Sequence, residues 1–214
     1  DSNVEIIEGD ILKLDIVPIL FPPKAELQNR GSSISQPNQN LGEIGKSLKS
    51  ADYKVIGNIP YCITSNFLRI VFEKWPRPQL IVLTVQKEVA QRIMAKPPHM
   101  NLLALSVQFY SSPTIVGHVS KGSFRPIPKV DSAIISLGPK AESLKPAQKD
   151  LFFKVIKAGF SEKRKQLVGN LAKNFDMMKE DLQDMFNKLG IQQDARAENL
   201  SIEQWKELAN YIKE

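Results

Sequence analysis

Apolar positions along the first 140 residues follow two spacings, which indicates strands interleaved with helices. Phe67, Leu68 and Val71 recur at the spacing of one helix face. Residues 80–85 are apolar except for Thr84, which is typical of a strand buried on both faces. The same patterns predict strands at 4–7, 53–57, 114–119 and 132–137, helices at 64–74 and 88–94, and a helix or a strand at 102–109.

After a linker-like stretch, the apolar positions follow helical spacing alone. Ser201 stands three residues before Gln204, which is the spacing of a capping box at the start of a last helix. Strands interleaved with helices, followed by helices alone, predict an α/β domain at 1–140 and a small α-helical domain at 146–214.

One stretch of the predicted α/β domain, residues 13–52, shows little regular patterning. Within it, residues 30–40 are rich in Ser, Gln, Asn and Gly, which is typical of loops. We therefore expect residues 13–52 to be mostly a loop or an insertion.

The composition is that of an ordinary folded protein. Hydrophobic residues make up 42% and charged residues 24% of the 214 residues, which excludes disorder of the whole chain.

The single cysteine, Cys62, and two histidines cannot complete a typical structural zinc site, so we expect no metal. Because no histidine is near Cys62 in sequence, we expect a buried thiol rather than a nucleophile. No apolar run reaches the ~20 residues that cross a bilayer, and no export signal is recognisable, so we expect a reducing compartment and no membrane contact.

Positive charge is concentrated just after residue 150. The chain carries a net charge of +6. Residues 151–175 carry six basic side chains and one acidic side chain, a net +5, whereas residues 176–214 carry five basic and nine acidic side chains, a net −4. Such a block is either the solvated face of a helix or a surface for an acidic partner such as nucleic acid, and the pattern alone leaves both open.

The clearest candidate for chemistry is Asn58-Ile59-Pro60-Tyr61, at the end of the strand predicted at 53–57. Ligands of open α/β sheets bind just beyond the carboxyl ends of strands. Asn58 offers an acceptor oxygen, Pro60 stiffens the backbone and directs a carbonyl, and Tyr61 offers a flat face. These groups suit a planar base with an exocyclic amine, because two acceptors can take both amine hydrogens while the ring stacks. A tight turn that merely ends the strand is the alternative.

Two further residues could line the same site. Asp10 follows the strand predicted at 4–7 and could accept from an amine or hydroxyl of a nucleotide, although a helix cap is the simpler explanation. Phe124 lies on the proline-stiffened run 124–129 and could be a second stacking face, unless it folds back onto its own domain. Gly45-Lys46-Ser47 resembles the end of a phosphate-binding loop, but that pattern requires Gly where Asn40 stands, so we reject a triphosphate site.

The candidate motif has companions in a fixed order along the chain. They are Glu8-Gly9-Asp10, Gly57-Asn58-Ile59-Pro60-Tyr61, Val85-Gln86-Lys87-Glu88-Val89-Ala90-Gln91-Arg92, Leu105-Ser106-Val107-Gln108-Phe109-Tyr110, Phe124-Arg125-Pro126-Ile127-Pro128-Lys129-Val130-Asp131-Ser132-Ala133, Phe160-Ser161-Glu162-Lys163-Arg164-Lys165-Gln166-Leu167, Asn170-Leu171 and Arg196-Ala197-Glu198-Asn199-Leu200-Ser201. With these motifs the chain resembles the ribosomal RNA adenine dimethyltransferases, which modify two adjacent adenosines near the 3′ end of small-subunit rRNA. The resemblance runs from residue 3 to the end, apart from 13–52.

The resemblance implies a fold, a cofactor and roles for individual residues. The fold would be α/β, with the seven-stranded Rossmann-like sheet of class I methyltransferases and a small C-terminal α-helical domain. The methyl donor would be S-adenosylmethionine (SAM), with Asp10 at its adenine and Asn58 near its methionine part. Asn58 and the Pro60 carbonyl would hold the N6 amine of the target adenine, and Tyr61 and Phe124 would stack on the flipped base.

The resemblance also implies how RNA is bound. A basic helix at Lys163-Arg164-Lys165 would lie on rRNA phosphates, and Lys157 and Arg125 would add further contacts. The partner would be small-subunit rRNA or the immature small ribosomal subunit, and we expect a monomeric, cytoplasmic protein.

Two departures from the family pattern leave alternatives open. The Gly-rich cofactor turn and two strands should precede Asp10, so we expect residues 1–214 to bind SAM poorly and the sheet to lack its first two strands. The number of residues between Asp10 and Asn58 is also larger than is usual in the family. One alternative is therefore a catalytically silent rRNA-binding or ribosome-assembly module. Another is the related antibiotic-resistance methylase of large-subunit rRNA, although the motifs at 129–133 and 163–167 favour the small-subunit enzyme.

Overall fold

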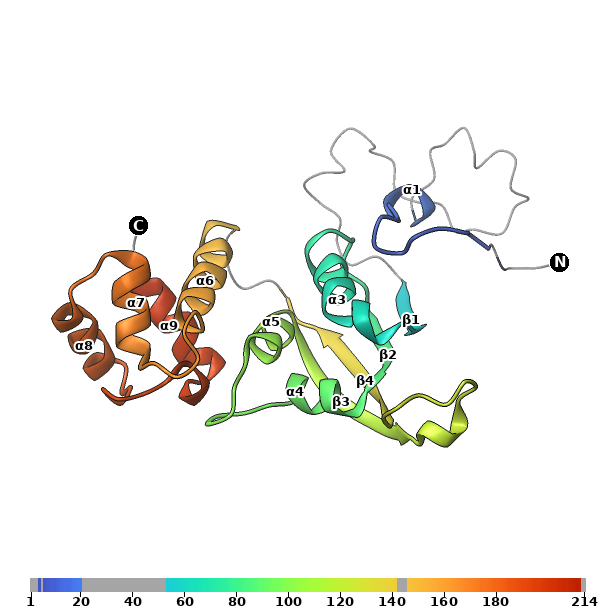
Figure 1. Ribbon diagram of the computed structural model, residues 1–214. Helices are drawn as coiled ribbons and strands as arrows, with labels where there is room; N and C mark the ends of the chain where they lie inside the picture. Colours follow the sequence, from blue (N-terminus) through green and yellow to red (C-terminus); the bar gives the residue numbers. More distant parts are fainter. Residues whose placement is uncertain (1–3, 5, 21–52, 142–145, 213–214) are drawn as a thin grey trace. The chain divides into compact units, whose positions relative to one another are not determined.

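The computed structural model describes residues 4, 6–20, 53–141 and 146–212. The chain forms two compact units, Asp1–Leu83 and Thr84–Glu214. Figure 1 labels the helices and strands along the chain. The domain boundary expected at 140–146 stays a prediction, as does the loop or insertion at 13–52, of which residues 21–52 lie outside the described part.

The first unit places a helix directly after a short strand. Its elements are α1 (Val17–Leu20), β1 (Lys54–Asn58), the 3-10 turn η1 (Tyr61–Ile63) and α3 (Thr64–Glu73). The helix α3 buries Phe67, Leu68 and Val71, which confirms the helix predicted at 64–74. Phe67 meets Trp75 edge to face, with ring centroids 5.6 Å apart, and so anchors the end of α3.

Tyr53 fixes the start of β1 to the loop after α3. Its hydroxyl donates a hydrogen bond to the Pro76 carbonyl, and its own carbonyl accepts from the Gln79 amide at 2.9 Å. Burial raises the pKa of Tyr53 to about 12, since the charged phenolate loses solvation. At the other end of β1, a Cβ on Gly57 would lie 3.3 Å from Leu83 Cδ2, which leaves little room for a side chain.

The strand predicted at 4–7 is wrong for the residues there that the structure describes. Val4, Ile6 and Ile7 are not in a strand. Ile6 is 90% exposed and Val4 is 71% exposed, so no layer covers the apolar side chains. A strand needs a paired neighbour for its backbone groups and a covered apolar face, and neither is present at these residues.

The sheet of the described residues has four strands in the order β1-β2-β4-β3. The further strands are β2 (Leu80–Gln86), β3 (Ser111–Val119) and β4 (Ser132–Pro139). β3 and β4 are antiparallel, paired from Ser111↔Pro139 to Val119↔Ser132, with an irregularity between Ile115 and Gly117. In β2, alternate side chains are fully buried and those between them are partly exposed, so the second face is covered less completely than predicted.

Two helices follow β2 in the second unit, α4 (Lys87–Ile93) and α5 (Leu102–Tyr110). The stretch 102–109 is thus a helix. Asn101 caps it, because its side-chain oxygen accepts from the Ala104 amide at 3.0 Å. Asn101 Nδ2 also donates to the Arg92 carbonyl at 2.9 Å, which ties the start of α5 to the end of α4.

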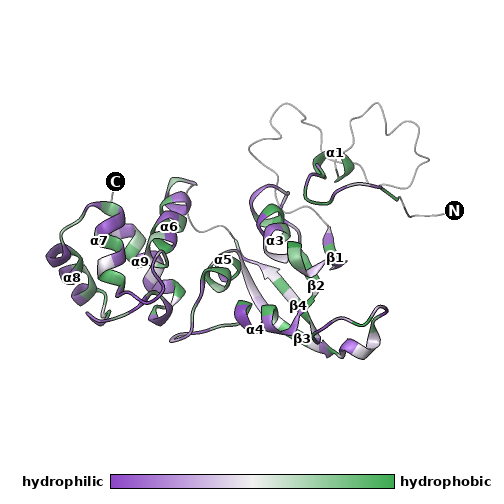
Figure 2. Ribbon diagram, viewed as in Figure 1, coloured by the Kyte–Doolittle hydropathy of each residue, from purple (hydrophilic) through white to green (hydrophobic). Residues whose placement is uncertain are grey.

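The C-terminal part is helical, as predicted. Its elements are α6 (Pro146–Gly159), α7 (Leu167–Phe175), α8 (Lys179–Lys188), the turn η3 (Ala197–Asn199) and α9 (Ile202–Tyr211). Figure 2 shows hydrophobic and hydrophilic stretches alternating along these helices, as expected where one face is buried. Their core contains the fully buried Phe152, Phe186 and Trp205, and it also includes Leu105 from α5.

Two local features hold α9 in this core. The capping box is confirmed, since the Gln204 amide donates to Ser201 Oγ at 3.2 Å and the Ser201 amide donates to Gln204 Oε1 at 3.0 Å. The indole of Trp205 lies against Gly159, where a Cβ would come within 2.3 Å of Trp205 Cη2. Only glycine leaves room for this contact between α6 and α9.

Candidate functional site

The turn that ends β1 has a fixed backbone. Pro60 has φ −55° and ψ 132°, and η1 begins directly after it. The Ile63 amide donates to the Pro60 carbonyl at 3.1 Å, and Thr64 Oγ1 donates to the Tyr61 carbonyl at 3.1 Å. A carbonyl oxygen has two lone pairs, so the Pro60 oxygen keeps one acceptor site beyond this bond.

Three of the predicted site residues lie on this turn. Asn58 and Pro60 are exposed, and Tyr61 is half-buried. The turn therefore presents an amide, a carbonyl and a ring at the end of a strand. Groups of this kind can accept both hydrogens of an exocyclic amine and stack on the base that carries it.

Asp10, the predicted cofactor residue, caps a turn of its own. Its Oδ1 accepts from the Leu12 amide at 3.0 Å, and its Oδ2 lies 3.7 Å from Lys13 Nζ. The side chain is 50% exposed, so the carboxylate keeps acceptor capacity for the amine of an adenine. The free acceptor capacity of this carboxylate fits the role predicted for Asp10 at the adenine of SAM. When bound, SAM would supply an electrophilic methyl group. The role itself stays a prediction.

Phe124 follows the 3-10 turn η2 (Lys121–Ser123) in the second unit and is half-buried. Asp131 braces this turn, because its Oδ1 accepts from the Lys121 amide at 3.0 Å. Arg125 is exposed, and its Nη1 donates to the carbonyls of Gly122 and Phe124 at 3.2 and 3.0 Å. Phe124 and Asn58 belong to different units, so the pocket predicted between them stays a prediction.

The basic residues Lys163, Arg164 and Lys165 lie on a turn between α6 and α7, so the predicted basic helix is wrong. We call residues 161–166 the basic turn. In a continuing helix the Gly159 carbonyl would accept from the amide four residues later. Here it accepts from Asn170 Nδ2 at 2.6 Å instead, so α6 ends at Gly159.

An ion pair joins the basic turn to α7. Lys173 Nζ lies 2.9 Å from Glu162 Oε1. The hydrogen bond from Lys173, with its positive charge, lowers the pKa of Glu162. Lys163, Arg164 and Lys165 are all exposed, and so is Lys157 near the end of α6. The positive charges predicted to bind RNA therefore face solvent.

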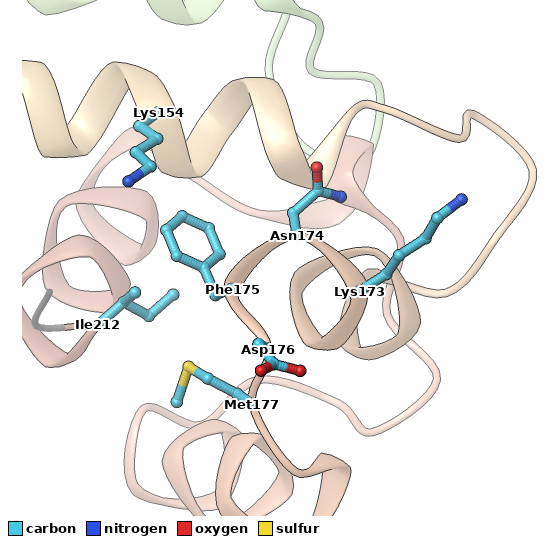
Figure 3. Close-up of a pocket in the computed structure, with 7 residues that line it drawn as sticks. All are labelled: Lys154, Lys173, Asn174, Phe175, Asp176, Met177 and Ile212. Atoms are coloured by element: carbon cyan, nitrogen blue, oxygen red, sulfur yellow. The ribbon is translucent and has the colours of Figure 1, made fainter.

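Beside the basic turn the second unit has an open hollow of about 410 Å³ (Figure 3). It is lined by Lys154, Lys173, Asn174, Phe175, Asp176, Met177 and Ile212. Lys154 Nζ lies over the Phe175 ring, 5.6 Å from its centroid. Lys154 is not among the predicted RNA-binding residues, although it stands about one helical turn before Lys157 and so shares a helix face with it.

Other expectations from composition have different outcomes. Cys62 is exposed, so the predicted buried thiol is wrong; it lies on η1, where the chain has just left the sheet. Among residues 4, 6–20, 53–141 and 146–212, no group of three or more His, Cys, Asp or Glu side chains could hold a metal ion. Within the same residues no helix is both long enough and apolar enough to span a bilayer.

The arrangement of strands and helices is that of a Rossmann-like rRNA methyltransferase. The crystal structure of a dimethyladenosine transferase from Plasmodium falciparum matches with a TM-score of 0.62 and 28% sequence identity, over 76% of this chain and 68% of that one. A crystal structure of the 23S rRNA methyltransferase ErmE matches in fold, with a TM-score of 0.61 and 22% identity over 78% of this chain and 68% of that one.

The family follows from the sequence comparisons. The family model "Ribosomal RNA adenine dimethylase" matches residues 1–214, and the chain belongs to this family. The "Ribosomal RNA small subunit methyltransferase A" of Dehalococcoides mccartyi is 43% identical over 207 residues, 96% of this chain and 62% of the relative. The protein of the same name from Crocosphaera subtropica is 36% identical over 221 residues, 99% of this chain and 72% of that protein. The chain thus spans less than two thirds of the Dehalococcoides relative.

Proposed function

We propose that this chain contributes the target-base and RNA-binding parts of a SAM-dependent enzyme that dimethylates N6 of two adjacent adenosines near the 3′ end of small-subunit rRNA. The turn from Asn58 to Tyr61 at the end of β1 carries the proposal, because it joins acceptors and a ring on a fixed backbone. The names of the curated relatives support rRNA of the small subunit as substrate.

The proposed chemistry follows from the target amine. The adenine N6 lone pair is delocalised into the ring, so the amine is a weak nucleophile. Hydrogen bonds from N6 to Asn58 Oδ1 and the Pro60 oxygen would favour a pyramidal nitrogen and aim its lone pair at the methyl donor. Positioning then supplies most of the rate enhancement, without a strongly basic side chain. Tyr61 and Phe124 would hold the extruded base by stacking.

The basic turn supports the second half of the proposal. Its three cations and the nearby Lys157 are exposed in the segment with the highest positive charge. Contacts with phosphate release counterions, so RNA affinity should fall steeply as salt rises. Arg125 would add a contact from the loop of Phe124.

The test of the catalytic part uses a hybrid in which this chain replaces the matched 207 residues of the Dehalococcoides relative. Methyl transfer from labelled SAM to unmethylated small subunits is measured for the hybrid and for its Asn58→Ala variant. Asn66→Ala is the matched control, since Asn66 is an exposed asparagine on α3. We expect Asn58→Ala to abolish transfer while RNA binding survives and Asn66→Ala stays active. Normal transfer by Asn58→Ala would show that the site is wrongly assigned.

A titration of labelled SAM against the 214-residue chain separates this proposal from a silent RNA-binding module. Saturable binding would exclude the silent module, whereas its absence would limit this chain by itself to RNA binding. We further propose a monomeric, cytoplasmic protein that acts on the immature small subunit. Sedimentation of the chain with and without that subunit tests both the oligomeric state and the partner.

A further inference from the structure

Asn170 is a polar residue in an apolar position. It is 2% exposed, and its neighbours Leu167, Val168 and Leu171 on α7 are buried with it. A buried carboxamide lowers stability unless its polar atoms find partners. Packing alone would favour an aliphatic side chain here, so the partners of Asn170 explain why it is polar.

Those partners are two backbone carbonyls around the start of the basic turn. Asn170 Nδ2 donates to the Gly159 oxygen at 2.6 Å and to the Glu162 oxygen at 3.1 Å. An amide nitrogen has two hydrogens, so both are used. One carbonyl belongs to the last residue of α6 and the other to the turn, so a single side chain fixes where the helix ends and where the turn begins.

Other bonds strengthen the same connection. Asn174 Nδ2 donates to Ser161 Oγ at 3.3 Å, and the Lys165 amide donates to the Glu162 carbonyl at 3.0 Å. Figure 3 shows Lys173 and Asn174 next to each other on α7, and Lys173 Nζ bonds Glu162 Oε1 at 2.9 Å. The backbone of the turn is thereby held from α7, while Lys163, Arg164 and Lys165 stay exposed.

We propose that Asn170 is a positioning residue for RNA recognition: it sets the backbone of the basic turn so that its three cations meet phosphates without further ordering. The inference rests on the proposed function of the turn. A loop that is already ordered loses less conformational entropy on binding, and so binds more tightly than a mobile loop with the same charges. Asn170 itself does not contact the RNA.

The test measures binding of the full chain to a labelled RNA hairpin with two adjacent adenosines in its loop, over a series of salt concentrations. We expect Asn170→Ala to weaken binding about tenfold. Its salt slope should also be smaller by about one, which corresponds to one lost phosphate contact. Faster hydrogen exchange of the Lys165 amide should accompany the loss. The control Leu182→Ala removes a buried side chain of α8 and should leave affinity and slope unchanged in the folded protein.

Two substitutions of the exposed Ser161 test the inference even if Asn170→Ala does not fold. Ser161→Gly and Ser161→Ala both remove one of the two acceptors of Asn174 Nδ2, but only glycine frees the backbone. We expect Ser161→Gly to bind the hairpin several-fold more weakly than Ser161→Ala, and equal affinities would overturn the inference. Unchanged affinity and slope in a folded Asn170→Ala would overturn it too. The triple variant K163A/R164A/K165A separates the role of Asn170 from the proposed RNA-binding function of the basic turn. If this variant binds as tightly as the parent, the proposed function of the turn is wrong as well.

Discussion

Replacing Gly159 by alanine tests the packing that places the basic turn. The new Cβ would lie 2.3 Å from Trp205 Cη2 and 2.8 Å from Leu167 Cδ1, far inside ordinary contact distance. Trp205 and Leu167 are fully buried, so neither can move into solvent. Overpacking of this kind costs about 1–3 kcal/mol. Alanine's better helix propensity offsets up to about 1 kcal/mol of this.

The net effect should be a loss of about 1–2 kcal/mol, which lowers Tm by roughly 3–10 °C in a unit of this size. Thermal unfolding followed by circular dichroism measures it. Gly169→Ala is the matched control: it makes the same change on α7, where no atom beyond its chain neighbours and its own helix backbone lies within 4 Å of the added Cβ. Gly169→Ala should leave Tm unchanged or raise it slightly. If both variants raise Tm equally, the close contact between α6 and α9 does not exist.

Three further outcomes are expected from the local electrostatics. Because the pKa of Glu162 is lowered, its ion pair with Lys173 stabilises the fold at pH values above the ordinary glutamate pKa, and this stabilisation is lost as pH falls through the lowered pKa. Lys173→Ala should return the pKa of Glu162 to its ordinary range in an NMR titration. Tyr53 should deprotonate only near pH 12, which ultraviolet absorbance can follow, and its contribution to stability should fall as pH rises from about 10 to 12. Tyr53→Phe loses the hydrogen bond to the Pro76 carbonyl, so its free energy of unfolding should be lower by about 1 kcal/mol. RNA affinity should fall steeply between 50 and 200 mM salt, roughly tenfold or more, and a flat salt series would remove the basic turn from the interface.

The elements with a strong local signal could be predicted from the sequence. The helix α3 and the strands β1 and β4 lie where the apolar pattern places them, because that pattern directly reflects which face is buried. The stretch at 102–109 was ambiguous because it is apolar on most sides. The structure decides for the helix, and Asn101, whose side chain caps it, is a sequence signal that the apolar pattern does not include.

The wrong predictions have tertiary causes. The basic run after α6 has a helical composition, but Asn170 takes the carbonyls of Gly159 and Glu162 and makes it a turn. No spacing rule reveals a side chain that bonds two carbonyls eight to eleven residues before it. Residues 4–7 alternate as a strand would, but Val4, Ile6 and Ile7, which the structure describes there, lie outside any strand. An apolar pattern shows which side chains favour burial, but it does not show whether another element of the fold packs against them.

The candidate site divides in the same way. Asn58, Pro60 and Tyr61 could be predicted together because they are consecutive at a strand end, and β1 does end at Asn58. Asp10 caps a turn at residues 11–13 and not a helix, so the helix cap considered for it is wrong, and its role at the cofactor stays a prediction. Phe124 belongs to a separate segment in the second unit, and the stacking role predicted for it stays a prediction.

The central claim is that the turn from Asn58 to Tyr61 receives the N6 amine of an adenosine in small-subunit rRNA. The most direct test maps methylated nucleotides in unmethylated small subunits after incubation with SAM and the hybrid enzyme that carries this chain. The account predicts N6,N6-dimethyladenosine at two neighbouring positions close to the 3′ end, and none with Asn58→Ala. Methylation elsewhere, in large-subunit rRNA, or undiminished in the Asn58 variant would contradict it.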